Sequence, residues 1–529
     1  MKKTWNIIFV LLVLPLVLTS CGKSGKEVKT ETVTNKYVYT GEAPITNEPG
    51  QTLSTLAQNS YYTTVDIKKA PIVEKVQKDA GINIDWTLVD PTNYVDSVSP
   101  MLASGVDLPD VVLLPDLDQN QTYLSSGLFT PLDTYFSLMP NYKAWLDANP
   151  IIKASLTASD GHIYYVPTTN VTHNYQPVLM YNMKWLKDAG LEVPKTLDEF
   201  TKVLRYYASH DMNGNGVKDE IPMSVKAQFL PYMFGPAFGL NFTSDIGSGF
   251  FENDKGEVVY AQATPEYKDY LTFLNGLYKE GLLEVEYTTL TRDQIVQRFA
   301  QDKTGITFDY GWQQSMTYSP QLSYYDGTPE TGVVAQQPLS GPSKGFFVGR
   351  NAVGSIFGVT SASKKIELAV KWLDWATSEK NQEMYVWGIE GESYTVNPDG
   401  TKKYTEKAAN NTWLQQLGIN PAQVLPAHQS VEATNALVAP WHAKQDAYIA
   451  QFVKDPWPFI YATADEAATS SQYMVDIQTY VDEMAVSFVT GTTPLTQYQA
   501  YLDALNRMNL PGMLQVRTAQ YQRFKNAMK

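Results

Sequence analysis

The sequence contains one cysteine, Cys21, and it lacks any run of about 18 apolar residues that would cross a bilayer as a helix. A chain with one cysteine forms no internal disulfide bond. The five histidines are scattered, and neither H-E-x-x-H nor C-x-x-C occurs, so no zinc site of common spacing is expected. No P-loop is present either, so we do not expect ATP as a ligand.

Positive charge is also in deficit, because 41 Lys and Arg residues stand against 55 Asp and Glu, for a formal net charge of −14. Nucleic acid binding needs a basic face, so nucleic acid is excluded as the partner. A neutral or an anionic small ligand stays open, since a few local Lys or Arg can serve an anion. With 529 residues, 43% of them apolar, the chain is long enough for roughly two to four domains.

The N-terminal segment predicts export and attachment to a membrane. Lys2 and Lys3 precede an apolar run over 7–18, which has the size of a signal-peptide core and is too short to span about 30 Å of hydrocarbon. Residues 18–22, Leu-Thr-Ser-Cys-Gly, resemble a bacterial lipobox, whose cysteine is acylated and becomes the new N-terminus. We expect a signal peptide over 1–20, a palmitate-type lipid anchor on Cys21 and a flexible tether over 21–48. The alternative is a chance free cysteine behind an ordinary signal peptide.

Hydrophobic periodicity in the body switches repeatedly between that of helices and that of strands. Residues 71–80 place Ile72, Val73 and Val76 on one helical face, and residues 82–88 then alternate as a strand. A second helical pattern over 94–104 precedes a short apolar run. Helices between short apolar strands indicate βαβ units, and therefore an α/β fold with mostly parallel sheets.

Several segments resemble one family. Residues 103–110 (ASGVDLPD), 181–190 (YNMKWLKDAG) and 194–200 (PKTLDEF) are similar to segments of extracellular solute-binding proteins of carbohydrate ABC transporters. Residues 387–394 (WGIEGESY) and 488–495 (FVTGTTPL) resemble its large Gram-positive lipoprotein subgroup, which is related to the alginate-binding proteins. No single block is specific, but their order along the body is.

The resemblance implies a two-lobed fold of the type II periplasmic-binding-protein kind, with a hinge between the lobes and the ligand in the cleft. The implied function is that of a monomeric, lipid-anchored receptor on the extracellular face of the cell membrane. It would bind an oligosaccharide and deliver it to an ABC-transporter permease without catalysing a reaction. The implied lobes are 50–168 plus 359–396 and 175–352 plus 397–529, with crossings near 166–178, 353–359 and 396.

Residues 211–220, Asp-Met-Asn-Gly-Asn-Gly-Val-Lys-Asp-Glu, form the sharpest local motif. Alternating oxygen donors let a tight loop wrap one hard cation, and Gly216 permits the turn. Position 12 of the loop is Pro222 and not the Glu of an EF-hand, but the carboxylates at positions 9 and 10 could close the shell instead. The alternative is a solvated turn without metal, although the alginate-binding relatives carry a calcium site of this spacing. We predict a structural calcium ion held by Asp211, Asn213, Asn215, the carbonyl of Val217, Asp219 and Glu220.

Candidate ligand contacts follow the predicted strands. Trp312 comes directly after the strand pattern over 305–310, and a pyranose packs its C–H face on such an aromatic plane. Asp116, with Asp118 as an equal candidate, follows the apolar run 111–114 and would accept hydrogen bonds from hydroxyls. For each, a core or surface role is the alternative. The remaining candidates are the amides of Asn174 and Gln176 in the polar stretch 170–176, and Tyr232, Trp441 and Trp457 in Pro-rich segments.

Two rival functions stay open, an extracellular glycan-cleaving enzyme and a peptide-binding receptor. The G-x-S-x-G match at 341–345 lacks the strand before it and the helix after it that a nucleophilic serine needs. A pair of glycosidase carboxylates cannot be recognised from sequence, because their separation is a three-dimensional property. Arg292 and Arg350 are candidates to pair a carboxylate of an anionic glycan, but the sequence does not place them.

Overall fold

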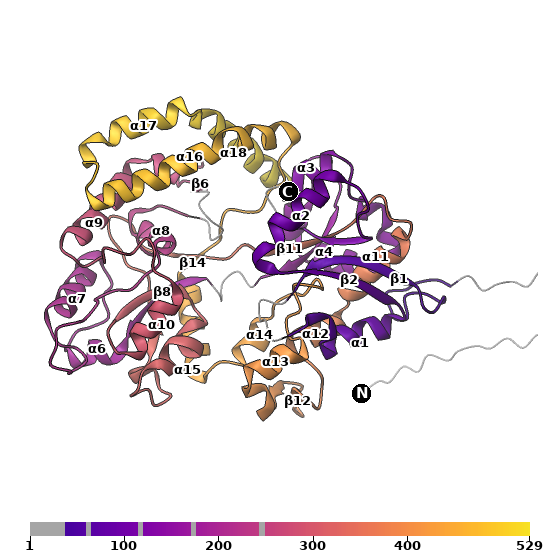
Figure 1. The fold of residues 1–529 in the computed structure, drawn as a ribbon, viewed down its shortest axis with the longest axis horizontal. Helices are drawn as coiled ribbons and strands as arrows, with labels where there is room; N and C mark the ends of the chain where they lie inside the picture. Colours follow the sequence, from indigo (N-terminus) through magenta and orange to yellow (C-terminus); the bar gives the residue numbers. More distant parts are fainter. Residues whose placement is uncertain (1–36, 60–64, 115–119, 171–175, 243–248, 529) are drawn as a thin grey trace, which may run out of the picture. The chain divides into compact units, whose positions relative to one another are not determined.

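The computed structural model describes residues 37–59, 65–114, 120–170, 176–242 and 249–528 (Figure 1). The chain divides into two units, residues 1–38 and 39–529. The first is described only at residues 37 and 38, so the predicted signal peptide, Cys21 and most of the tether lie outside the described residues. None of the described helices combines the length and the hydropathy that a bilayer crossing needs.

A five-stranded sheet in the order β2-β1-β3-β11-β4 organises one part of the second unit. Its parallel core is β1 (Thr52–Gln58), β2 (Asn83–Val89) and β3 (Val111–Leu113), joined through α1 (Pro71–Ala80) and α2 (Tyr94–Ser104). The βαβ units expected over 53–114 are therefore confirmed. The antiparallel strand β11 (Val353–Val359) then inserts between β3 and β4 (Tyr165–Thr169).

Helix α1 shows why this part of the sequence folds as it does. Pro71 sits in the first turn, where its missing N–H costs nothing, and Gly81 ends the helix in the left-handed region at φ 77°. The predicted apolar stripe of Ile72, Val73 and Val76 is fully buried. It packs against α11 (Ile366–Ala376) and α12 (Glu379–Trp387).

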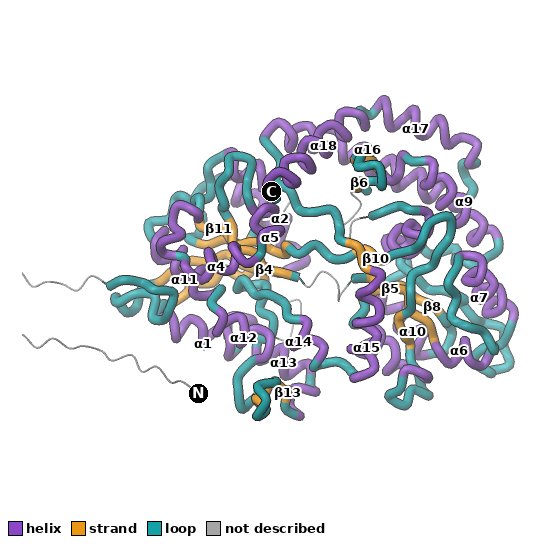
Figure 2. The backbone as a smooth tube through the Cα atoms, turned by 180° about the vertical axis from the view of Figure 1, so that it is seen from behind, coloured by secondary structure: helices purple, strands orange, loops and turns teal. Residues whose placement is uncertain are grey.

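A three-stranded sheet in the order β8-β5-β9 organises the other part (Figure 2). Strand β5 (Pro177–Asn182) pairs antiparallel with both β8 (Ile306–Tyr310) and β9 (Val333–Ala335), so the expected mostly parallel pairing does not hold here. Two surrounding helices, α7 (Leu197–Ser209) and α10 (Arg292–Ala300), begin with complete capping boxes at Thr196 and Thr291. The long helices α16 (Ala464–Thr490) and α18 (Leu510–Ala527) pack side by side.

Further helices and paired strands complete the described part of the chain. The helices are α3 (Asn120–Ser125), α4 (Pro140–Ala148), α5 (Pro150–Leu156), α6 (Met183–Asp188), α8 (Leu230–Phe234), α9 (Pro265–Lys279), α13 (Asn411–Leu417), α14 (Val431–Asn435), α15 (Pro440–Ile449) and α17 (Tyr498–Arg507). The paired strands are β6 (Phe250–Glu252) with β7 (Val258–Tyr260), β10 (Phe347–Val348) with β14 (Val453–Lys454), and β12 (Tyr394–Val396) with β13 (Lys402–Tyr404).

Candidate functional site

The predicted calcium loop, residues 211–220, follows α7 in the sequence. In space it is close to the segment that precedes β8. Asp211 organises it, because its carboxylate accepts hydrogen bonds from the amides of Gly214 (2.7 Å), Asn215 (3.2 Å) and Gly216 (2.8 Å). Gly214 and Gly216 have φ values of 71° and 79°, which side-chain-bearing residues rarely adopt. The two glycines therefore let the chain curl tightly around the Asp211 carboxylate.

The other predicted ligands face the same loop. The Oδ1 atoms of Asn213 and Asn215 accept the amides two residues ahead, and their Nδ2 groups donate to Asp219 at 3.4 and 3.2 Å. Glu220 accepts the Met212 amide on Oε1 at 2.7 Å. Its Oε2 is buried and has no hydrogen-bond partner among the described residues. A buried carboxylate oxygen without a partner is costly, and a hard cation would satisfy it.

A lysine partly balances this acidic loop. Lys303 Nζ lies 2.7 Å from Asp219 Oδ2, and this hydrogen bond holds the pKa of the Asp219 carboxyl below its ordinary value. In the part of the chain that the structure describes, no three or more His, Cys, Asp or Glu side chains are arranged to hold a metal ion. Three of the predicted ligands, Asp211, Asp219 and Glu220, are side chains of this kind, and the structure does not bring them together as such a group. The other predicted donors are Asn side chains and the Val217 carbonyl. An all-oxygen set with carboxylates fits a hard cation.

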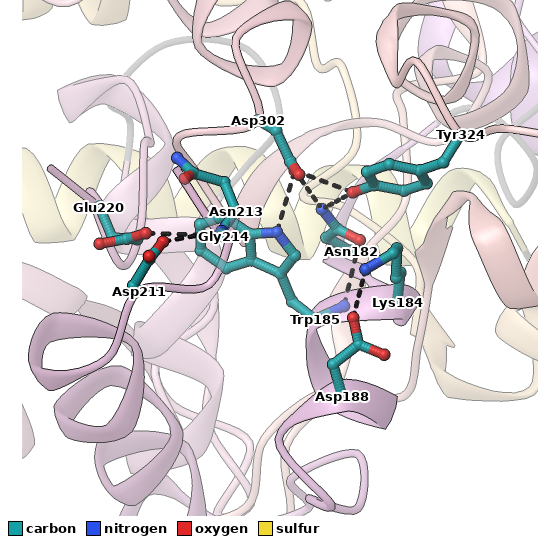
Figure 3. A network of polar contacts seen from close by, with 10 residues as sticks. All are labelled: Asn182, Lys184, Trp185, Asp188, Asp211, Asn213, Gly214, Glu220, Asp302 and Tyr324. Carbon is teal, nitrogen blue, oxygen red and sulfur yellow. Dashed lines mark hydrogen bonds and ion pairs between the residues drawn. The ribbon is translucent and has the colours of Figure 1, made fainter. Parts of the chain in front are cut away.

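The loop is tied to the start of β8 and to α6. The Ile221 amide donates to the Lys303 carbonyl at 2.8 Å, directly beside Asp302. Asp302 accepts the indole N–H of Trp185 (2.9 Å) and the hydroxyl of Tyr324 (2.8 Å). Figure 3 shows this network and the loop in one view, with the Trp185 nitrogen directed at Asp302. The loop therefore braces the beginning of the strand whose far end carries Trp312.

Trp312 lies where it was predicted, just past the end of β8. The Gly311 amide donates to the backbone carbonyl of Gln176 at 3.1 Å, which fixes the turn that carries the indole. Trp312 is half-buried, and within the described ranges no aromatic ring or cation packs on it. An indole held by its backbone, with no protein ring on its face, is suited to stacking on a sugar.

The other aromatic candidates already have protein neighbours. Trp441 donates its indole N–H to the Tyr325 hydroxyl at 3.3 Å, and Trp457 stacks on Tyr521 with ring centroids 4.5 Å apart. Tyr232, on α8, meets Phe242 edge-on at 6.4 Å. Each is half-buried, so its role in ligand binding stays a prediction.

The predicted amides and carboxylates divide between described and undescribed positions. Gln176 is 2% exposed, and its Oε1 has no hydrogen-bond partner among the described residues. It directly precedes β5, and its backbone carbonyl accepts the amide of Gly311, the residue before Trp312. Asp116, Asp118 and Asn174 lie outside the described residues.

The structure adds a polar chain that the sequence did not reveal. Ser315 Oγ is hydrogen-bonded to His442 Nδ1 at 2.5 Å. His442 Nε2 lies 3.3 Å from Asp446 Oδ1 but makes no hydrogen bond with a described residue. His442 and Asp446 are one helical turn apart on α15, but Ser315 is distant in sequence, so only the His–Asp half had a local signal. The hydrogen bond between Ser315 and His442 connects the turn after Trp312 to α15, which also carries Trp441.

A buried ion pair closes the far end of β8. Arg292 donates two hydrogen bonds of 2.7 Å to Asp309, whose side chain is 1% exposed. Asp309 also accepts the Tyr318 hydroxyl at 2.7 Å and the Tyr310 amide at 2.8 Å. A bidentate guanidinium with two further donors leaves the Asp309 carboxylate fully bonded.

Comparison with known proteins identifies the family. A model of the bacterial extracellular solute-binding proteins matches residues 63–383. The chain belongs to this family. It is 25% identical over 99% of both chains to the fructooligosaccharide ABC transporter substrate-binding protein FusA of Streptococcus pneumoniae serotype 4. It is also 25% identical to the lipoprotein LipO of Bacillus subtilis, over 65% of this chain and 68% of LipO.

Solved structures share the fold. The crystal structure of the alginate-binding protein AlgQ2 without calcium ion superposes with a TM-score of 0.72 at 21% identity, covering 92% of this chain and 100% of that one. The predicted α/β fold of the two-lobed solute-binding class is thereby confirmed, as is the resemblance on which it was based. The chain is an extracellular solute-binding protein.

Proposed function

We propose that this protein is a receptor that binds an oligosaccharide outside the cell and delivers it unchanged to the permease of an ABC transporter. Family membership and a full-length match to a substrate-binding protein of a fructooligosaccharide transporter support it. The observation that carries it is the half-buried Trp312, held by its backbone at the end of β8 with no described ring on its face.

The chemistry of such a site is recognition without reaction. The indole of Trp312 takes the apolar face of a sugar ring, while buried amides such as Gln176 hydrogen-bond the hydroxyls at its rim. The lobes are those implied by the sequence, 50–168 plus 359–396 and 175–352 plus 397–529. A ligand that contacts both would stabilise their closed arrangement.

Attachment and calcium complete the proposal. The lipobox-like segment supports a lipid on Cys21, and LipO, a relative, is named a lipoprotein. Mass spectrometry of the protein from membranes tests this, because Cys21→Ala should remove the acyl mass and release the chain. The oxygen-rich loop 211–220 would hold a structural calcium ion.

The direct experiment is calorimetry of the purified chain with panels of oligosaccharides and peptides, followed by chromatography of the recovered ligand. We expect an oligosaccharide to bind with one site per monomer and to return intact. Turnover of the saccharide would support the glycan-cleaving alternative, and binding of peptides alone would support the peptide receptor. Either result contradicts the proposed function.

A further inference from the structure

The far end of β8 collects positive charge around one aromatic ring. The guanidinium carbon of Arg292 lies 6.0 Å from the centroid of the Tyr310 ring, and that of Arg350 lies 5.8 Å from the same centroid. Both side chains are half-buried. Tyr310 is the last residue of β8, two positions before Trp312 in the sequence, so these cations lie at the end of the strand that leads to the proposed sugar platform.

A third cation joins them from a separate segment. Lys226 Nζ lies 5.2 Å from the centroid of the Phe229 ring, and Phe229 packs edge-on against Tyr310 with centroids 5.9 Å apart. Burial, and then the nearby charge of Arg292, lower the pKa of the Lys226 ammonium. The charged form of Lys226 is therefore disfavoured, and an anion bound nearby would stabilise it.

The protein itself supplies little negative charge here. Asp309 pairs with Arg292 and has its remaining hydrogen bonds taken by Tyr318 and the Tyr310 amide. Neither Arg350 nor Lys226 forms an ion pair with any described residue. Both cations are half-buried, so a bound anion could pair with either without displacing a described acidic partner.

We propose that Arg350 and Lys226 form a carboxylate subsite, so that the saccharide this receptor binds on Trp312 is an acidic one that carries uronate groups. The inference deepens the proposed function and rests on it. A guanidinium offers parallel donors that match a planar carboxylate, and an ammonium adds a point charge beside it. The Tyr310 ring lies beside the Arg350 guanidinium, and such a contact lowers the side-chain entropy that remains to be lost when a carboxylate binds.

The experiment compares acids with their neutral counterparts. Tetramers of galacturonate, mannuronate and glucuronate are titrated calorimetrically into the purified chain, each beside its methyl ester, with kestose and raffinose as neutral oligosaccharides. At least one uronate should bind about tenfold or more tightly than its ester, the value of a charge-assisted hydrogen bond. Raising the ionic strength should weaken the acid more than the ester.

Variants locate the effect. Arg350→Gln should reduce affinity for the preferred uronate by about 10- to 100-fold and leave its ester nearly unchanged. Lys226→Gln should reduce it in the same direction by less. Arg507→Gln is the matched control, because it removes the same charge from an exposed position at the end of α17 and should alter neither affinity. Melting curves check that each variant is folded.

Each outcome decides something. Equal binding of acid and ester, or a uronate affinity that survives Arg350→Gln and Lys226→Gln, overturns the carboxylate subsite. Binding of kestose or raffinose without any uronate also overturns it and leaves the oligosaccharide receptor standing. If no saccharide binds at all, the proposed function itself fails, and the subsite fails with it.

Discussion

The two ends of strand β8 differ in the charge that the protein leaves uncompensated. At the start, the carboxylates of Asp211, Asp219 and Glu220 meet one ion-paired lysine, Lys303. At the far end lie the cations Lys226, Arg292 and Arg350, and the carboxylate of Asp309 pairs with Arg292 alone among them. The two charge clusters lie at opposite ends of β8, which runs only from Ile306 to Tyr310.

This difference indicates that the two ends of β8 are suited to ligands of opposite charge. The acidic end contains a buried oxygen of Glu220 without a described partner, which suits a cation. The basic end contains half-buried cations without described ion pairs beside an indole, which suits an anion with an apolar face. A cation that fixes the first end would brace the strand that presents the second.

Removal of calcium should have the largest effect. With chelator, the carboxylates of the loop repel each other and the unfolding free energy should fall, by about 4 kcal/mol where calcium exceeds its Kd a thousandfold. Urea denaturation with and without chelator measures this. Asp211→Ala should abolish the dependence on calcium, because Asp211 organises the loop through three amides.

The matched control is Asp254→Ala, which removes an exposed acid from the turn between β6 and β7. It should leave the calcium dependence intact. If chelator changes the stability of neither the wild-type protein nor the Asp211→Ala variant, the acidic end holds no structural cation and the comparison loses one of its sides.

Arg292→Gln should have the next largest effect. It strips the buried Asp309 carboxylate of its bidentate partner, and breaking such a pair costs on the order of 3 kcal/mol of unfolding free energy. Arg350→Gln breaks no ion pair with a described residue and should cost less than about 0.5 kcal/mol. Denaturation of both variants separates the structural cation from the ligand-binding one. Equal losses in the two would contradict that division.

How much the sequence could predict depended on sequence distance. The loop 211–220 was recognisable because its donors lie within ten residues, and the stripe of α1 because it repeats with the helical period. The cluster of Lys226, Arg292 and Arg350 had no such signal, since three separate segments supply it. Long-range pairing, such as β11 inserted beside β3, likewise depends on packing that no local pattern encodes.

The lobe boundaries illustrate the same limit. The sequence assigned 397–529 to the second lobe, a division that stays a prediction. In the structure the Gln58 amide donates to the Gln423 carbonyl and the Thr169 amide to the Ala427 carbonyl, at the ends of β1 and β4. Such contacts connect residues 397–529 with the first sheet. No periodicity or turn signal within this segment predicts them.

His428 is a buried histidine whose titration should make the stability of the protein depend on pH. His428 stacks on Trp145 with centroids 4.2 Å apart, and burial lowers the pKa of its imidazole to about 3. In the unfolded chain the pKa of a histidine is near 6.5, so protonation of His428 favours unfolding. The stability that neutral His428 contributes is therefore complete above about pH 6.5 and is lost as pH falls toward 3.

The variant His428→Asn isolates this contribution, which should be on the order of 2 kcal/mol between pH 7 and pH 5. Comparison with the wild-type protein is needed because Asp374 titrates in the same range. Burial raises the pKa of Asp374 to about 6, so its contribution to stability falls as pH rises from 4 to 6, while that of His428 increases. The difference between the two unfolding curves should shrink steadily with acidity. A constant difference would show that His428 does not titrate on unfolding in this range.

The smallest expected effect distinguishes the parts of the basic end. Trp312→Ala removes the apolar face but no charge, so it should weaken a uronate oligosaccharide and its methyl ester alike, by roughly tenfold. Arg350→Gln should weaken the uronate alone. Calorimetry of both ligands with both variants therefore yields two distinct patterns. If Trp312→Ala also affected the uronate alone, the indole would be acting through the cations around Tyr310 and not as an independent sugar platform.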